Sequence, residues 1–160
     1  MAYAFVNAWN NAGPTSGTTT TVSPTGVTAG NLLYVFIQCA DSRTISSVSD
    51  TVNTYTACNA KVAPNAQDIF GYYSSVATGG SLTITITFSS SATNILSAAL
   101  EYSGIAASPL DKNVSASTAS GTTITTASVT TVQDGELLVL AAISEKVSRP
   151  VDTQSGYTLR

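Results

Sequence analysis

Histidine is absent from this sequence, so its carboxylates are the main residues able to perform acid–base or metal chemistry. The lack of histidine excludes Ser-His-Asp and Cys-His catalytic arrangements and every histidine-based metal site. A pair of carboxylates could instead hydrolyse glycosidic bonds if the two lay about 5–10 Å apart across a cleft. The nine candidates are Asp41, Asp50, Asp68, Glu101, Asp111, Asp134, Glu136, Glu145 and Asp152.

Most of these carboxylates stand beside turn residues, where Asp commonly accepts hydrogen bonds from the loop backbone. Glu101 falls inside the predicted strand Asn94–Tyr102. It could serve as a catalytic acid or base, but the pattern favours an outward-facing residue of a strand whose other face is core. We therefore predict that the protein is not an enzyme and that it has no catalytic residues and no cofactor.

Calcium is the one metal to weigh, because loop Asp and Asn residues supply oxygen ligands. Asp41, Asp50 and Asn53 could converge, and so could Asp111 and Asn113. The sequence contains no EF-hand and no repeated Asp pattern, so turn capping explains these residues better than a metal site. We expect no bound metal.

Aromatic residues indicate a different kind of site on the run Asn31–Ala40. If alternate residues from Leu33 to Cys39 face the core, then Tyr34, Phe36 and Gln38 occupy the opposite face. An aromatic face flanked by amides can bind a sugar or another protein. Alternatively, a loop or a neighbouring subunit covers this aromatic face. For Trp9, the only tryptophan, packing is favoured over sugar stacking.

The two cysteines, Cys39 and Cys58, are too few for a disulfide framework or a structural zinc site. They could form a single disulfide if the fold brings their strands together. They could equally be buried free thiols that pack as small apolar side chains. The spacing leaves both interpretations open.

The elements that would position these residues are short strands separated by turn residues. Leu82, Ile84, Ile86 and Phe88 alternate with threonines, as in an antiparallel strand with one buried face. We predict an all-β fold, a two-sheet antiparallel β-sandwich of jelly-roll type. The predicted strands are Ala2–Trp9, Thr18–Ser23, Asn31–Ala40, Ile45–Ser49, Tyr55–Lys61, Asp68–Ser75, Ser81–Phe88, Asn94–Tyr102, Thr122–Val129 and Gly135–Ser144. The predicted core contains Leu33, Val35, Ile37, Leu82, Ile84, Ile86, Leu138 and Leu140.

An internal pseudo-repeat relates residues 17–56 to residues 121–158. In each copy a Thr-rich strand, a loop, an apolar strand and an Asp-Thr…Tyr-Thr segment follow in the same order. We predict one domain over residues 1–160. The second copy lacks counterparts of three strands, so the domain is either a fragment or a subunit completed by a neighbouring chain through strand addition. The alternative is that the first strand folds back and closes the sheet within one chain.

The motifs GNLL, TITITFS, LEYSG and PLD resemble those of a widespread group of bacterial extracellular and phage-associated β-sandwich modules. The most specific pieces are Glu101–Gly104 and Pro109–Asp111. The resemblance implies a lectin-like or jelly-roll fold and a place on a cell exterior or virion surface. It implies no catalytic residues.

Composition supports the same interpretation. Only 9% of the residues are charged, against about a quarter in a typical soluble domain. The net charge is −3 and the basic residues are scattered, so we expect no nucleic-acid partner. No apolar stretch is long enough to span a membrane. We predict a structural or adhesive surface module that contacts other protein subunits, itself included, or surface glycans; the alternative is a carbohydrate-binding module.

Overall fold

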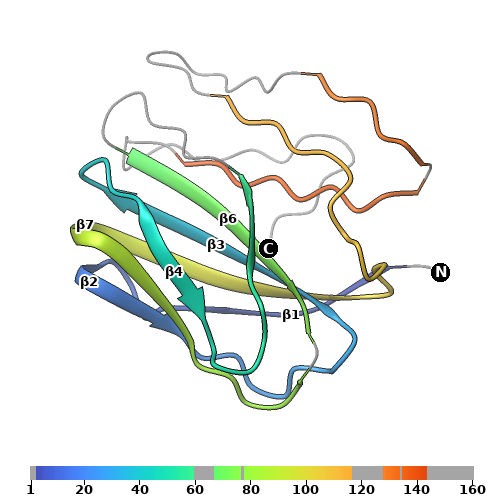
Figure 1. The fold of residues 1–160 in the computed structure, drawn as a ribbon, viewed down its shortest axis with the longest axis horizontal. Coiled ribbons are helices and arrows are strands. Elements are labelled where there is room, and N and C mark those ends of the chain that lie inside the picture. The colour runs from blue at the N-terminus through green and yellow to red at the C-terminus, as the bar shows by residue number, and fades with distance from the viewer. Residues whose placement is uncertain (1–2, 60–66, 77, 117–127, 134, 144–160) are drawn as a thin grey trace.

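A computed structural model describes residues 3–59, 67–76, 78–116, 128–133 and 135–143. This part of the chain contains seven strands and no helix, and all of its strand pairs are antiparallel (Figure 1). The prediction of an all-β antiparallel chain is therefore confirmed. The strands are β1 (Ala4–Asn10), β2 (Thr15–Val22), β3 (Leu32–Ala40), β4 (Ile45–Ser49), β5 (Thr56–Asn59), β6 (Gln67–Ser75) and β7 (Ile84–Ser103).

The 20-residue strand β7 organises the sheet. Its second half pairs with β1 on one side and with β3 on the other, and β3 pairs in turn with β6, and β6 with β5. Its first half pairs with β2 and β4. Figure 1 shows β7 bending past β2 and β4 at one end and running beside β1 and β3 at the other. The two strands predicted at Ser81–Phe88 and Asn94–Tyr102 are thus two halves of one strand.

Strands β1 and β2 together follow one edge of β7. The backbone N–H of Asn11, just after β1, donates to the carbonyl of Ser97, and β2 begins its pairing at Thr15 opposite Ile95. The register of β2 shifts twice, on either side of Gly17. Such irregularities increase twist and bend a strand, which is how one strand can serve two parts of a sheet.

The core lies on one face of β3 and of the first half of β7. Leu33, Val35 and Ile37 belong to the same buried cluster as Ile84 and Ile86, although these stretches are not hydrogen-bonded to each other. Leu82, just before β7, is buried in it as well. Period-2 alternation therefore predicted these core positions correctly, because each alternating run has one face turned inward.

The prediction for the second copy of the apolar run is wrong where the structure describes it. Leu138 and Leu140 are 58% and 55% exposed, and residues 135–143 form no strand. The core position taken by β3 in the first copy already has partners on both sides, β6 and β7, so a second strand has no place beside it. The remaining parts of the pseudo-repeat, residues 121–127 and 144–158, lie outside the described residues.

Candidate functional site

The three residues of the predicted platform share one face of β3 but differ in burial. Phe36 lies opposite Gly71 of β6 and Ala98 of β7. Gln38 follows two residues later on the same face, and its side-chain amide donates to the Gln67 side chain at 3.3 Å. Both are half-buried. Tyr34 is only 8% exposed. The open part of the platform is therefore at Phe36 and Gln38, and their ligand role stays a prediction.

Tyr34 is buried because it packs over a glycine. A Cβ atom at Gly71 would lie 2.5 Å from the Tyr34 hydroxyl oxygen and 2.8 Å from Sγ of Cys58. The absence of a side chain at Gly71 thus makes room for the hydroxyl and the thiol together. Burial, and next the adjacent Cys58 thiol, raise the pKa of Tyr34 above its usual range. The register of β3 with β6 is unbroken at Gly71, whereas the register of β5 with β6 shifts where Asn59 pairs with Gly71.

Beside Phe36 the surface is hollowed. This Phe36 hollow, with a volume of about 450 Å³, lies between the end of β1 and the outer face of β3 and β7. Leu96 at its side is 36% exposed. Its lining carries no charge; it consists of Asn10, Asn11, Ala12, Gly13, Phe36, Leu96, Ser97 and Ala98.

Asn11 fixes the rim of the Phe36 hollow. Its side-chain amide donates to the carbonyls of Gly13 and Ile95, each at 3.1 Å. Its Oδ1 accepts the backbone N–H of Ser97 at 2.9 Å. The side chain therefore replaces backbone pairing where the chain leaves β1, and the loop that follows is held against β7.

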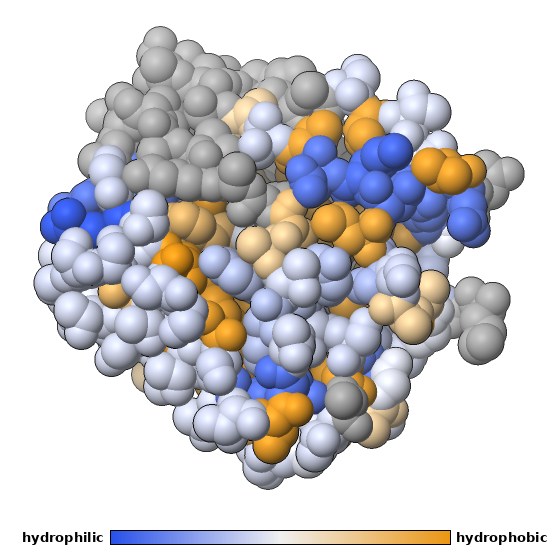
Figure 2. Space-filling view, in the orientation of Figure 1, coloured by the Kyte–Doolittle hydropathy of each residue, from blue (hydrophilic) through white to orange (hydrophobic). Residues whose placement is uncertain are grey.

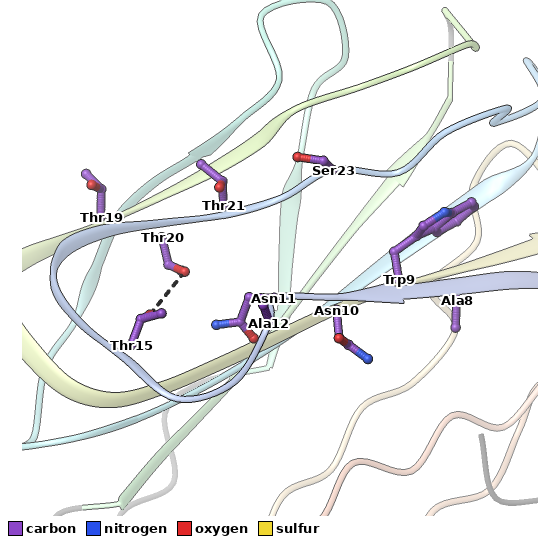
Figure 3. Close-up of a pocket in the computed structure, with 10 residues that line it drawn as sticks. All are labelled: Ala8, Trp9, Asn10, Asn11, Ala12, Thr15, Thr19, Thr20, Thr21 and Ser23. Carbon is purple, nitrogen blue, oxygen red and sulfur yellow. Dashed lines mark hydrogen bonds between the residues drawn. The ribbon is translucent and has the colours of Figure 1, made fainter.

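A second concave surface lies between β1 and β2. This β1–β2 groove has a volume of about 730 Å³. Figure 3 shows Trp9 of β1 at one end of the groove, and at the other end Thr20 reaching toward Thr15, 3.4 Å away. Trp9 also packs against the core, as predicted. The lining is again uncharged: Ala8, Trp9, Asn10, Asn11, Ala12, Thr15, Thr19, Thr20, Thr21 and Ser23.

Sequence reasoning missed the β1–β2 groove. A signal was present, because none of the first 40 residues is Asp, Glu, Lys or Arg. Figure 2 shows one face of the molecule, on which pale residues of intermediate hydropathy predominate and separate orange apolar and blue hydrophilic groups lie between them. The pairing of β1 and β2 along a bent β7 could not be read from the sequence, so the groove between them could not be placed.

Asp50 stabilises a turn. Its Oδ1 accepts the backbone N–H groups of Val52 and Asn53, and its Oδ2 accepts the Asn53 amide and the Tyr55 hydroxyl, at 2.7–3.0 Å. Asn53 in turn bonds both backbone groups of Thr78. Burial acts to raise the pKa of Asp50, but these hydrogen bonds outweigh it and hold the pKa below its ordinary value.

Two other loop carboxylates in the described ranges are also engaged in protein hydrogen bonds. Asp41 accepts the Thr93 hydroxyl at 2.6 Å, and Asp111 accepts the backbone N–H of Val132 at 2.9 Å. In the described ranges no three Asp, Glu or Cys side chains gather closely enough to hold a metal ion. Asp50 thus caps a turn, as its four hydrogen bonds show.

Glu101 was expected to face outward, and that expectation is wrong. It is 1% exposed, opposite core-facing Leu33 in the ladder, so the register turns it inward. Its Oε1 accepts the backbone N–H of Thr28 at 2.9 Å and the side-chain amide of Asn31 at 2.6 Å. The carboxylate thus attaches the segment before β3 to β7, which explains how a charge is tolerated there.

The structure decides between the two alternatives for the cysteines, a disulfide or two buried thiols. Cys39 and Cys58 are both buried and neither forms a disulfide. Cys39 lies on the core side of β3 with Sγ 4.0 Å from Oδ2 of Asp68, whereas Cys58 packs beside Tyr34 on the other side. The sheet separates the two thiols.

No protein-family model, no curated protein and no solved structure matches this chain. Within the described ranges, no helix has the length and apolar character needed to cross a membrane.

Proposed function

We propose that this chain is a non-enzymatic β-sandwich module of jelly-roll type, with a structural or adhesive role on a cell exterior or virion surface. The core between β3 and the first half of β7 supports the sandwich, and the resemblance at Glu101–Gly104 and Pro109–Asp111 supports the setting. In this proposal the module contacts neighbouring chains or surface glycans.

The observation that carries this proposal is that charged and uncharged polar groups occupy different places in the structure. The carboxylates of Asp50 and Glu101 are engaged inside the fold by backbone and amide donors. The concave surfaces, in contrast, are lined by aromatic, hydroxyl and amide groups without charge. Uncharged, partly apolar surfaces favour contact with other proteins or neutral sugars over acid–base chemistry.

The experiment that tests the proposal combines two measurements on the same purified chain. Sedimentation velocity over a range of protein concentrations measures self-association, and a glycan array measures sugar binding. We expect at least one of them to be positive. A chain that stays monomeric at every concentration and binds no glycan contradicts the structural or adhesive function.

Carbohydrate binding at the Phe36 hollow is the second candidate function. Phe36 is half-buried, and Asn10, which also lines the hollow, and Gln38 lie on the same side of the sheet. An aromatic ring offers an apolar surface to the C–H face of a sugar while amides bond its hydroxyls. The volume of about 450 Å³ lies within the ordinary range for small-ligand sites.

Isothermal titration with the best array glycan tests this second function. Phe36→Ala should abolish the binding heat, because the stacking surface is lost. Tyr3→Ala is the matched control, since Tyr3 is an exposed aromatic residue outside the hollow. Binding that survives Phe36→Ala places any sugar site elsewhere.

A further inference from the structure

The edge formed by β1 and β2 has no strand beside it in the described part of the chain. Each of these strands pairs only with β7. Every second residue of such an edge directs its N–H and C=O groups away from the sheet, where another strand can bond them. The edge is long, with seven residues in β1 and eight in β2.

Within the described residues this edge carries none of the charged side chains that commonly protect a free edge and no proline inside its strands, although its register shifts on either side of Gly17 and between Phe5 and Asn7. Proteins commonly guard free edges with charged side chains, especially Lys, with proline or with a covering segment. Between Ala4 and Val22 there is no charged residue, and Pro14 stands in the connection rather than in a strand. The side chains along β2 are Thr, Ser, Gly and Val, small enough to let a second backbone approach.

The surface next to the edge fits an extended chain. The β1–β2 groove of about 730 Å³ runs beside both strands, with Trp9 half-buried at one side and the hydroxyls of Thr15 and Thr20 at another. A strand seated there would place apolar side chains toward Trp9 and its backbone against β2. Main-chain hydrogen bonds supply the affinity in such strand addition.

We propose that the edge of β2 is a self-association site at which a second copy of this chain adds its own β2 edge in antiparallel fashion. The proposal rests on the structural function proposed above and names its partner. A two-fold contact uses the same patch on both copies, so each must tolerate its own image. This edge does so because it is neutral, and all charged residues of a chain with net charge −3 lie beyond residue 40.

Charge placed on the edge tests the proposal. Thr19→Lys and Thr21→Lys each put an ammonium group on β2 at an exposed position, where a two-fold contact brings it near its copy. Thr83→Lys is the matched control, an exposed threonine outside the groove and outside β2. Urea denaturation of every variant confirms that the fold is intact.

Sedimentation velocity should show association of the native chain and of Thr83→Lys, with at least a tenfold loss of affinity in both β2 variants. Amide hydrogen exchange in β2 should slow as the native chain associates. If association persists in both β2 variants but is lost in Phe36→Ser, the β2 contact is wrong and the proposed structural function survives. If the native chain stays monomeric, the β2 contact is wrong; a glycan bound in the groove, with no association, also overturns it.

Discussion

In the turn between β4 and β5, the hydroxyl of Tyr55 donates a 2.9 Å hydrogen bond to Oδ2 of Asp50. The same carboxylate receives three further donors from Val52 and Asn53. Asn53 then ties the turn to Thr78, in the connection between β6 and β7. One carboxylate therefore links a local turn to a segment 25 residues further along the chain.

Removing the Tyr55 hydroxyl should destabilise the fold. A hydrogen bond to a charged acceptor contributes about 1.5–3 kcal/mol, so Tyr55→Phe should lower the free energy of unfolding by about that amount. Urea denaturation measures it. The control is Tyr73→Phe in β6, where the side chain is half-buried; it should change stability by less than about 0.5 kcal/mol. Equal effects of the two substitutions would show that the Asp50 contact contributes nothing.

The lowered pKa of Asp50 predicts an acid-sensitive stability. Its pKa in the fold lies below the ordinary value of 3.8. A carboxylate of this kind contributes its full stabilisation above its unfolded pKa and loses it as the pH falls through the folded pKa. The free energy of unfolding, measured by urea titration from neutral pH down into this range, should therefore decrease less steeply in Asp50→Asn.

A matched comparison separates this titration from general weakening. Ile84→Val removes one buried methylene-sized group and no charge, and it typically costs about 0.5–1.5 kcal/mol. It should lower the stability curve equally at every pH. If Asp50→Asn retains the full acid dependence of the native chain, other carboxylates cause that dependence.

Close packing at Gly71 predicts a substitution effect that a second substitution relieves. The Cβ of Gly71→Ala would overlap the Tyr34 hydroxyl and the Cys58 thiol, and overpacking typically costs about 1–3 kcal/mol. Tyr34→Phe removes the nearer of the two obstructing atoms. In a double-mutant cycle measured by urea denaturation, Gly71→Ala should cost less in the Tyr34→Phe background. Additive effects would mean that the sheet moves apart at Gly71 instead.

Alternation of apolar and polar residues predicted much of the fold. The inward positions of β3 and of the first half of β7 follow from it, because in a strand alternate side chains share a face. The same rule misplaced Glu101, since a one-residue choice of register decides which face a residue occupies and the sequence does not encode the partner strand locally. The same rule wrongly predicted a strand at residues 135–143, because apolar character alone does not provide a neighbouring strand to pair with.

The candidate surfaces were predictable only in part. Phe36 and Gln38 could be assigned to one face of β3, but the burial of Tyr34 depends on Gly71 and Cys58, which reach it from other strands. Likewise the β1–β2 groove depends on the bend of β7. Contacts between residues distant in sequence require the pairing order, which composition and spacing do not supply.

Tyr34 and Phe36, which the sequence places on the same face of β3, should differ in how strongly their substitution destabilises the fold. Tyr34 is buried over Gly71, so Tyr34→Ser should remove a packed ring and cost about 3–5 kcal/mol of unfolding free energy. Phe36 is only half-buried and lies beside a hollow, so Phe36→Ser should cost less than half as much while removing the contact surface. Urea denaturation measures both costs, and sedimentation velocity with glycan titration measures the contact. Gln38→Ala is the control on the same face, expected to change stability by less than about 0.5 kcal/mol. Equal destabilisation by Tyr34→Ser and Phe36→Ser would place Phe36 in the packed interior and remove the Phe36 hollow as a contact site.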